Sequence, residues 1–110
     1  MSERLASARQ LQALRREHHP NCVVCGEHGL HLQCDVTDDN EVSASFDCGE
    51  VFQGYPQRLH GGIISSLLDG VMTNCMFALG HAAVTAELRV RFRHPVTTDR
   101  RATLLSLIHI

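Results

Sequence analysis

Residues 59–80 constrain the fold of this 110-residue chain more than any other stretch. Their sequence, LHGGIISSLLDGVMTNCMFALG, places two glycines directly before a strongly apolar segment. The apolar side chains recur every four residues in two adjacent rows, Ile63, Leu67, Val71, Cys75 and Ile64, Leu68, Met72, Met76. Two such rows cover more of a helix than one amphipathic stripe does. We therefore predict a central helix that is buried on most sides, with Gly80 as its C-terminal cap.

The same stretch contains candidate catalytic groups. Asp69 is the only formally charged residue between Gly61 and Gly80, and it shares a helical row with Ser65. Gly61 and Gly62 let the backbone approach a ligand closely, and the first N–H groups of the helix have no partner inside it. These donors and the positive end of the helix dipole can hold a carbonyl oxygen that gains negative charge during acyl transfer. Asp69 would then act on water or on the carbonyl carbon.

The separation of these groups favours a site shared by two chains. Seven residues at a rise of ~1.5 Å place Asp69 roughly 10 Å along the helix axis from Gly62. A reacting carbon must lie about 3 Å from both groups. They can meet if two chains pack antiparallel and each lends its Asp69 to the glycine turn of the other. A homodimer would then be part of the mechanism.

Three sequence features together resemble a known family. They are His60-Gly61-Gly62, an acid nine residues after the histidine, and the later sequence TAELRVRFRHPV at residues 85–96. In these three features the chain resembles the hotdog-fold thioesterases of the phenylacetyl-CoA thioesterase type. The resemblance implies an α+β hotdog fold, in which an antiparallel sheet wraps around a long central helix. It also implies hydrolysis of an acyl-CoA thioester without a cofactor.

The resemblance assigns roles to individual residues. Gly61 and Gly62 supply the oxyanion donor, and Asp69 comes from the partner subunit as base or nucleophile. His60 is included among the catalytic residues, although a histidine before a glycine turn more often orients the backbone than carries a proton. The assembly implied is a homodimer with shared active sites or a dimer of such dimers, that is, a homotetramer.

One position departs from the family pattern. Relatives often carry Asn or Gln six residues before the histidine of the turn, whereas this chain has Gly54, with Gln53 and Gln57 nearby. This departure keeps open a second hypothesis, a hotdog protein that binds acyl-CoA without hydrolysing it.

Residues that contact the substrate are expected on both sides of the helix start. Residues 52–59 contain Gly54 and Pro56 without periodicity and are predicted to form a loop. Phe52 and Tyr55 in this loop either line an acyl pocket or pack in the core. The full set of candidate substrate-binding residues is Phe52, Tyr55, Gln57, Ser65, Thr85, Arg91 and Arg93.

A long strand is predicted over residues 82–96. Leu88, Val90 and Phe92 alternate with Arg89, Arg91 and Arg93, which is typical of two faces of a strand. The arginines either form a solvated face or contact the phosphates of coenzyme A, because the guanidinium group suits phosphate recognition. Two shorter strands, 30–36 and 41–46, are predicted to form a hairpin around the polar turn 37–40, and a further strand begins at residue 101.

The N-terminal region is predicted to be a short amphipathic helix over residues 3–17 that Pro20 ends. A segment dense in metal ligands follows, with Cys22-x-x-Cys25 and His31-x-x-Cys34. The gap of five residues between the pairs is shorter than the dozen or so usual in two-pair zinc sites. We therefore expect no metal and a tight turn before the first strand. A small zinc module remains a third hypothesis. A redox role for Cys22 and Cys25 is less expected still, because the sequence lacks the βαβ pattern that surrounds thioredoxin-like redox motifs.

The amino-acid composition excludes several classes of function. A net charge of −2 and a pI near 6.4 give no general attraction to nucleic acids or membranes. All ten basic residues are Arg, which excludes Schiff-base lysine chemistry and a P-loop lysine. Five cysteines, without a signal-peptide pattern, favour free thiols in the cytoplasm.

We expect a single domain over residues 1–110, with a lead-in over 1–19. The hotdog core over 20–110 is expected to be incomplete, because so few strands cannot wrap so apolar a helix.

Overall fold

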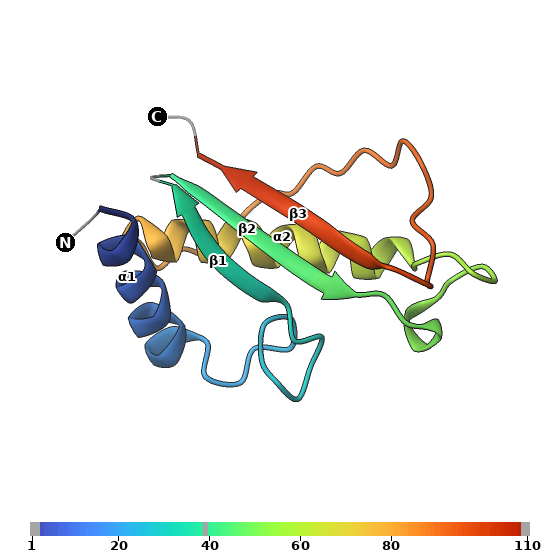
Figure 1. Ribbon diagram of the computed structural model, residues 1–110, viewed down its shortest axis with the longest axis horizontal. Helices are drawn as coiled ribbons and strands as arrows, with labels where there is room; N and C mark the ends of the chain where they lie inside the picture. Colours follow the sequence, from blue (N-terminus) through green and yellow to red (C-terminus); the bar gives the residue numbers. More distant parts are fainter. Residues whose placement is uncertain (1–2, 39, 109–110) are drawn as a thin grey trace.

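The computed structural model describes residues 3–38 and 40–108 of the chain. Its elements are α1 (Glu3–His18), β1 (Gln33–Asp38), β2 (Glu41–Asp47), the short 3₁₀ helix η1 (Glu50–Phe52), α2 (Gly61–Ala78) and β3 (Arg101–Leu107). The strands form one antiparallel sheet in the order β1-β2-β3. The long helix α2 packs against one face of this sheet, and α1 packs against α2 and β1 (Figure 1). The predicted α+β arrangement of a central helix and an antiparallel sheet is confirmed.

The helix α2 provides one side of the hydrophobic core. Leu67, Val71, Cys75 and Phe77 are almost completely buried, and they belong to the same cluster as the inward side chains of the sheet. The helix ends as predicted, because Gly80 adopts the left-handed conformation with φ of 87°. The N–H groups of Gly80 and His81 donate to carbonyls of the last turn, those of Phe77 and Met76. A non-glycine residue at position 80 would be strained.

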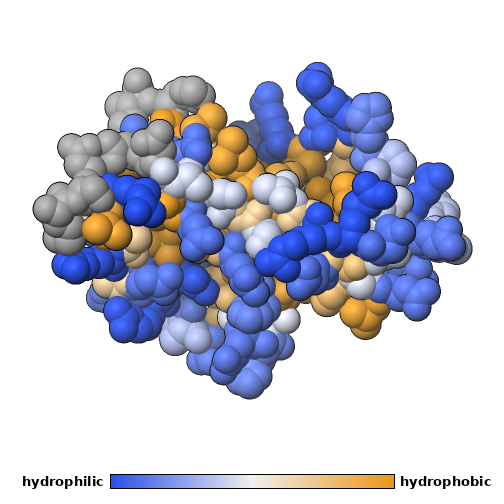
Figure 2. Space-filling model, in the orientation of Figure 1, coloured by the Kyte–Doolittle hydropathy of each residue, from blue (hydrophilic) through white to orange (hydrophobic). Residues whose placement is uncertain are grey.

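The predicted hairpin is present, and β3 extends it. Val42, Ala44 and Phe46 of β2 are buried, whereas the residues between them point outward. This alternation follows from the two-residue period of a strand. The outer face of the sheet is mainly hydrophilic (Figure 2), and there Arg101 donates to Asp47 and Ser45. Of the predicted turn 37–40, Asp39 lies outside the described residues.

The predicted strand over residues 82–96 is wrong. This segment is extended but belongs to no sheet, and it runs back beside α2 before joining β3 (Figure 1). Leu88 and Val90 are half-buried and Arg89 and Arg91 are exposed, but Phe92 is 57% exposed, so the predicted apolar face exists only in part. A strand needs a neighbour that supplies backbone hydrogen bonds, and the described residues provide none along this segment. The nearest ladder contact is a single bridge between Arg58 and Thr97.

The predicted N-terminal helix is confirmed and ends one residue later than expected, at His18. Leu11 is its most buried side chain and contacts the same core as α2. Among the described residues, neither helix combines the length and the apolar character that crossing a membrane requires.

Candidate active site

The candidate site begins where the loop over residues 53–60 turns into α2. His60 is the N-cap residue, and its Nδ1 accepts a hydrogen bond of 2.8 Å from the N–H of Gly62. The first regular helical bond follows, from the N–H of Ile64 to the carbonyl of His60. Within the described residues, the N–H of Gly61 has no hydrogen-bond partner. Of the two glycine donors predicted for a carbonyl oxygen, the structure therefore leaves that of Gly61 free and engages that of Gly62.

Close contacts explain why glycine suits this turn. A Cβ atom at position 62 would lie 3.1 Å from Nδ1 of His60 and 3.2 Å from its Cε1. A side chain there would press on the capping imidazole. At position 61 a Cβ atom would meet the ring of Phe92 at 3.6 Å, which is an ordinary contact. Gly61 therefore lies directly against the segment that precedes β3.

A cleft of about 630 Å³ opens at this end of α2. Its apolar lining includes Tyr55, Leu59, Ile64 and Phe92, and its polar lining includes Arg58, Arg93 and His94. Gly54 and Gly61 contribute backbone surface to the same cleft. The cleft thus combines an apolar wall, two cationic side chains and an unpaired backbone N–H, a combination that suits a ligand with an acyl chain, a carbonyl and phosphates.

Asp69 lies elsewhere on α2. It is half-buried and accepts a hydrogen bond of 2.5 Å at Oδ1 from the hydroxyl of Thr85. It does not line the cleft, and eight residues at ~1.5 Å rise separate it from Gly61 by roughly 12 Å along the axis. Ser65, one turn before Asp69, donates to the carbonyl of Gly61 at 3.0 Å. In one chain, the carboxylate and the free N–H do not meet at a single reacting atom.

The structure places some of the candidate substrate-binding residues at the cleft and the others outside it. Tyr55 and Arg93 line the cleft. Phe52 lies in a smaller depression beside Gly62 and packs against Phe46 with ring centroids 5.1 Å apart, so it fits the core-packing alternative at least in part. Gln57 has a positive φ of 65° and is exposed outside the cleft, as is Arg91. Thr85 contacts Asp69 rather than the cleft.

Sequence reasoning missed several residues that line the cleft. Arg58, Leu59, Ile64 and His94 were not among the candidates, and Phe92 was considered only for its alternation. Arg58 and Leu59 directly precede His60, so proximity in sequence to the glycine turn was an available signal. The approach of residues 92–96 to the turn had no local signal, because it depends on how the chain folds back beside α2.

The cysteine-rich turn lies apart from this cleft. Burial raises the pKa of the Cys22 thiol, but hydrogen bonds from the N–H groups of Cys25 and Val24 outweigh that effect, so its pKa is lowered overall. Burial and the neighbouring Cys22 raise the pKa of Cys25. Burial also raises the pKa of Cys34, to about 12. The expected tight turn before the first strand is present, closed by the hydrogen bond from the Gly26 N–H to the Cys22 carbonyl.

The chain is similar to known proteins in both sequence and fold. Residues 57–106 match the sequence profile of the thioesterase superfamily. The fold is similar to the crystal structure of a thioesterase superfamily protein, with a TM-score of 0.68 and 26% sequence identity over 74% of this chain and 43% of that one. Together with the central helix and its sheet, these matches support a hotdog-like fold similar to that of the thioesterase superfamily.

A curated relative is similar to a large part of the chain. Acyl-coenzyme A thioesterase THEM4 of Bos taurus is 34% identical over 73 residues, which are 64% of this chain and 30% of the relative. The chain therefore spans less than a third of the length of this relative and less than half of that of the structural neighbour.

Proposed function

We propose that the protein hydrolyses acyl-CoA thioesters in active sites shared by two copies of the chain. The observation that carries this proposal is the N–H of Gly61, which has no partner among the described residues and belongs to a residue that lines a cleft with an apolar wall and two arginines. The similarity to an acyl-coenzyme A thioesterase supports the choice of substrate class.

In the proposed mechanism the thioester carbonyl oxygen accepts a hydrogen bond from the N–H of Gly61. Water attacks the carbonyl carbon while Asp69 of the second copy accepts the proton of that water. The oxygen gains negative charge, which the free N–H and the helix dipole stabilise. The carbon–sulfur bond then breaks, and the departing sulfur takes the proton, which leaves a carboxylic acid and coenzyme A. Alternatively, the Asp69 carboxylate itself attacks the carbonyl carbon as a nucleophile.

The lining of the cleft supports an assignment of its two ends. Leu59, Ile64 and Phe92 would contact the acyl group, and Tyr55 would lie at the rim, where it is 82% exposed. Arg58 and Arg93 would contact the phosphates of the coenzyme. Thr85, which donates to Asp69, would orient the carboxylate.

The test of this proposal is hydrolysis of aryl, short-chain and long-chain acyl-CoA thioesters by the wild-type chain and by Asp69→Asn. We expect turnover with at least one class of thioester and a loss on the order of 10²- to 10⁴-fold in the variant, which removes the base without changing the size of the side chain. Asp35→Asn is the matched control, because Asp35 is exposed on the sheet. Turnover of Asp69→Asn close to that of the control would contradict the role of Asp69.

A second candidate function is binding of acyl-CoA without hydrolysis. The observation that favours it is Gly54, which lines the cleft without a side chain that could polarise the carbonyl. A Cβ atom there would lie 3.3 Å from the His60 ring. Saturable binding of acyl-CoA with no turnover across the panel would select this alternative, and turnover would reject it.

A further inference from the structure

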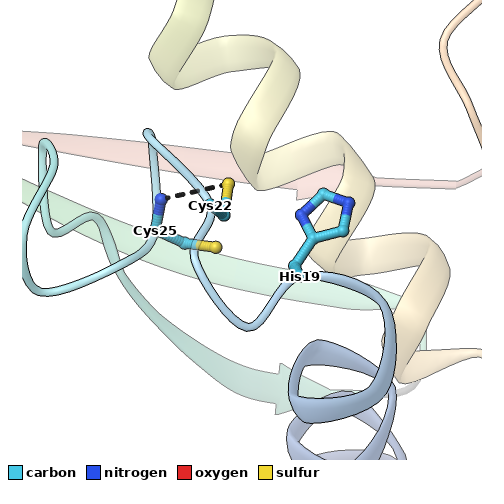
Figure 3. Close-up of side chains that lie close together, drawn as sticks. All are labelled: His19, Cys22 and Cys25. Atoms are coloured by element: carbon cyan, nitrogen blue, oxygen red, sulfur yellow. Dashed lines mark hydrogen bonds between the residues drawn. The ribbon is translucent and has the colours of Figure 1, made fainter.

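Three potential metal ligands converge between α1 and β1, beside the C-terminal half of α2 and away from the cleft. His19 directly follows α1, and Cys22 and Cys25 belong to the turn that leads to β1 (Figure 3). One ligand atom from each of the three residues lies within 4.8 Å of the other two. His18, His28 and Cys34 are not part of this cluster.

The backbone of the turn holds the two sulfurs in place. The N–H of Gly26 donates to the carbonyl of Cys22 at 2.8 Å, and the N–H of Cys25 points at the Cys22 sulfur at 3.5 Å. A Cβ atom at position 26 would lie 2.5 Å from the Cys22 carbonyl oxygen, so the turn requires glycine. Arg15 of α1 donates to the carbonyl of Cys25 at 2.9 Å. These bonds fix both cysteines independently of any disulfide, and an N–H directed at sulfur stabilises a thiolate ligand.

The imidazole of His19 is held beside these sulfurs and lacks a partner. Its ring contacts Phe77 edge-on, with centroids 5.0 Å apart and an interplanar angle of 87°. Its Nδ1 is buried, and no described residue forms a hydrogen bond with it. A buried ring nitrogen without a partner is costly. Coordination of a metal ion would remove that cost, because a neutral imidazole nitrogen is a good ligand for zinc.

We propose that His19, Cys22 and Cys25 bind one zinc ion through the imidazole and two thiolates, with the fourth position open to water or a small ligand. Zn–S bonds of ≈ 2.3 Å place two sulfurs about 3.8 Å apart in a tetrahedral site. Between the two sulfurs the present spacing therefore needs a contraction of about 1 Å at most, within reach of side-chain rotation. Thiolate and imidazole together select zinc over magnesium or calcium, which prefer oxygen.

This site differs from the one that the sequence spacing argued against. That argument paired the two cysteines with His31 and Cys34, but His31 is exposed with a positive φ of 56°, and Cys34 lies in β1. The third ligand comes instead from the residue after α1. Bound zinc would join the end of α1 to the turn before β1, and Val24 of this turn contacts α2 at Gly70. Its effect would be on the stability of this end of the molecule rather than on the cleft.

Metal analysis of the purified chain under reducing conditions tests the proposal. We expect one zinc per chain after gel filtration, a Tm raised by zinc, and thiolate-to-metal charge-transfer absorption with tetrahedral d–d bands when Co²⁺ replaces zinc. Cys22→Ser and Cys25→Ser should abolish these signals. His19→Gln should weaken zinc binding by about 10- to 100-fold or more, by comparison with the effect of removing groups that support a metal site.

Two matched controls separate a built site from adventitious binding. His18→Gln changes the adjacent, exposed histidine, and Cys48→Ala removes a cysteine outside the cluster; both should retain one zinc per chain. Circular dichroism of each variant shows whether the fold is intact. Either of two results would overturn the proposal: a folded, reduced wild-type chain that retains no stoichiometric zinc, or a His19→Gln variant that binds zinc as tightly as the His18→Gln control.

Discussion

At the scale of single residues, His60 decides which backbone donor is available at the glycine turn. Its Nδ1 accepts from the N–H of Gly62, and the N–H of Gly61 is left without a partner among the described residues. The motif His-Gly-Gly predicts that donors are present, but it does not predict which one is free. That choice depends on the rotamer of one imidazole, which no sequence pattern records.

The capping role of His60 leads to a prediction. We expect His60→Ala to lower the free energy of unfolding by about 1 kcal/mol, as loss of an N-cap usually does, and to lower turnover by loosening the turn. His60→Asn should retain most of both, because the Asn side chain can also accept from the N–H of the second helical residue. Urea denaturation and steady-state kinetics on both variants check this. A His60→Asn variant with wild-type stability but turnover reduced 100-fold or more would instead indicate a proton carrier.

At the scale of secondary structure, the sequence predicted the elements whose pattern is local. The boundaries of α2, the hairpin and α1 follow from apolar periodicity, caps and turns within a few residues of each other. The segment 82–96 shows the limit of such reasoning. Its alternation matches the partial burial of Leu88 and Val90 but not the exposure of Phe92, and pairing requires a neighbouring strand that the local pattern cannot supply.

The packing of α2 against the cysteine-rich turn gives a second prediction. A Cβ atom at Gly70 would lie 2.5 Å from Cγ1 of Val24 and 3.3 Å from Cδ2 of Leu32. Gly70→Ala gains about 1 kcal/mol of helix propensity and should lose about 2 to 3 kcal/mol through overpacking. We therefore expect a net decrease of about 1 to 2 kcal/mol in the free energy of unfolding, measured by urea denaturation.

Removal of the opposing side chain provides the control for this effect. In the background of Val24→Ala, the clash is absent and Gly70→Ala should be neutral or stabilising, so the double-mutant cycle should show favourable coupling. A Gly70→Ala variant that is more stable than the wild type would contradict the close approach of the turn to α2.

At the scale of the whole molecule, the candidate site joins parts that are distant in sequence. The loop before α2, the start of α2 and residues 92–96 together form the cleft. The sequence predicted Gly61, Tyr55 and Arg93 for the site, since they lie in or beside recognisable motifs. It missed Arg58, although this residue lies two positions before His60, and it missed the approach of residues 92–96, which no local pattern marks. Which segments meet is a property of the chain path and not of any one motif.

The central claim is that Asp69 of one copy acts at the glycine turn of another. The measurement that tests it most directly is the turnover of a mixed dimer, isolated through two different tags, of an Asp69→Asn copy and a Gly61→Val copy. Each variant alone should be nearly inactive, because every site in its homodimer has either no Asp69 carboxylate or a Gly61 N–H crowded by the valine side chain. The mixed dimer contains one site with a normal turn and a normal Asp69, so we predict recovery of about half the wild-type turnover per dimer. An isolated mixed dimer no more active than either parent would contradict the account.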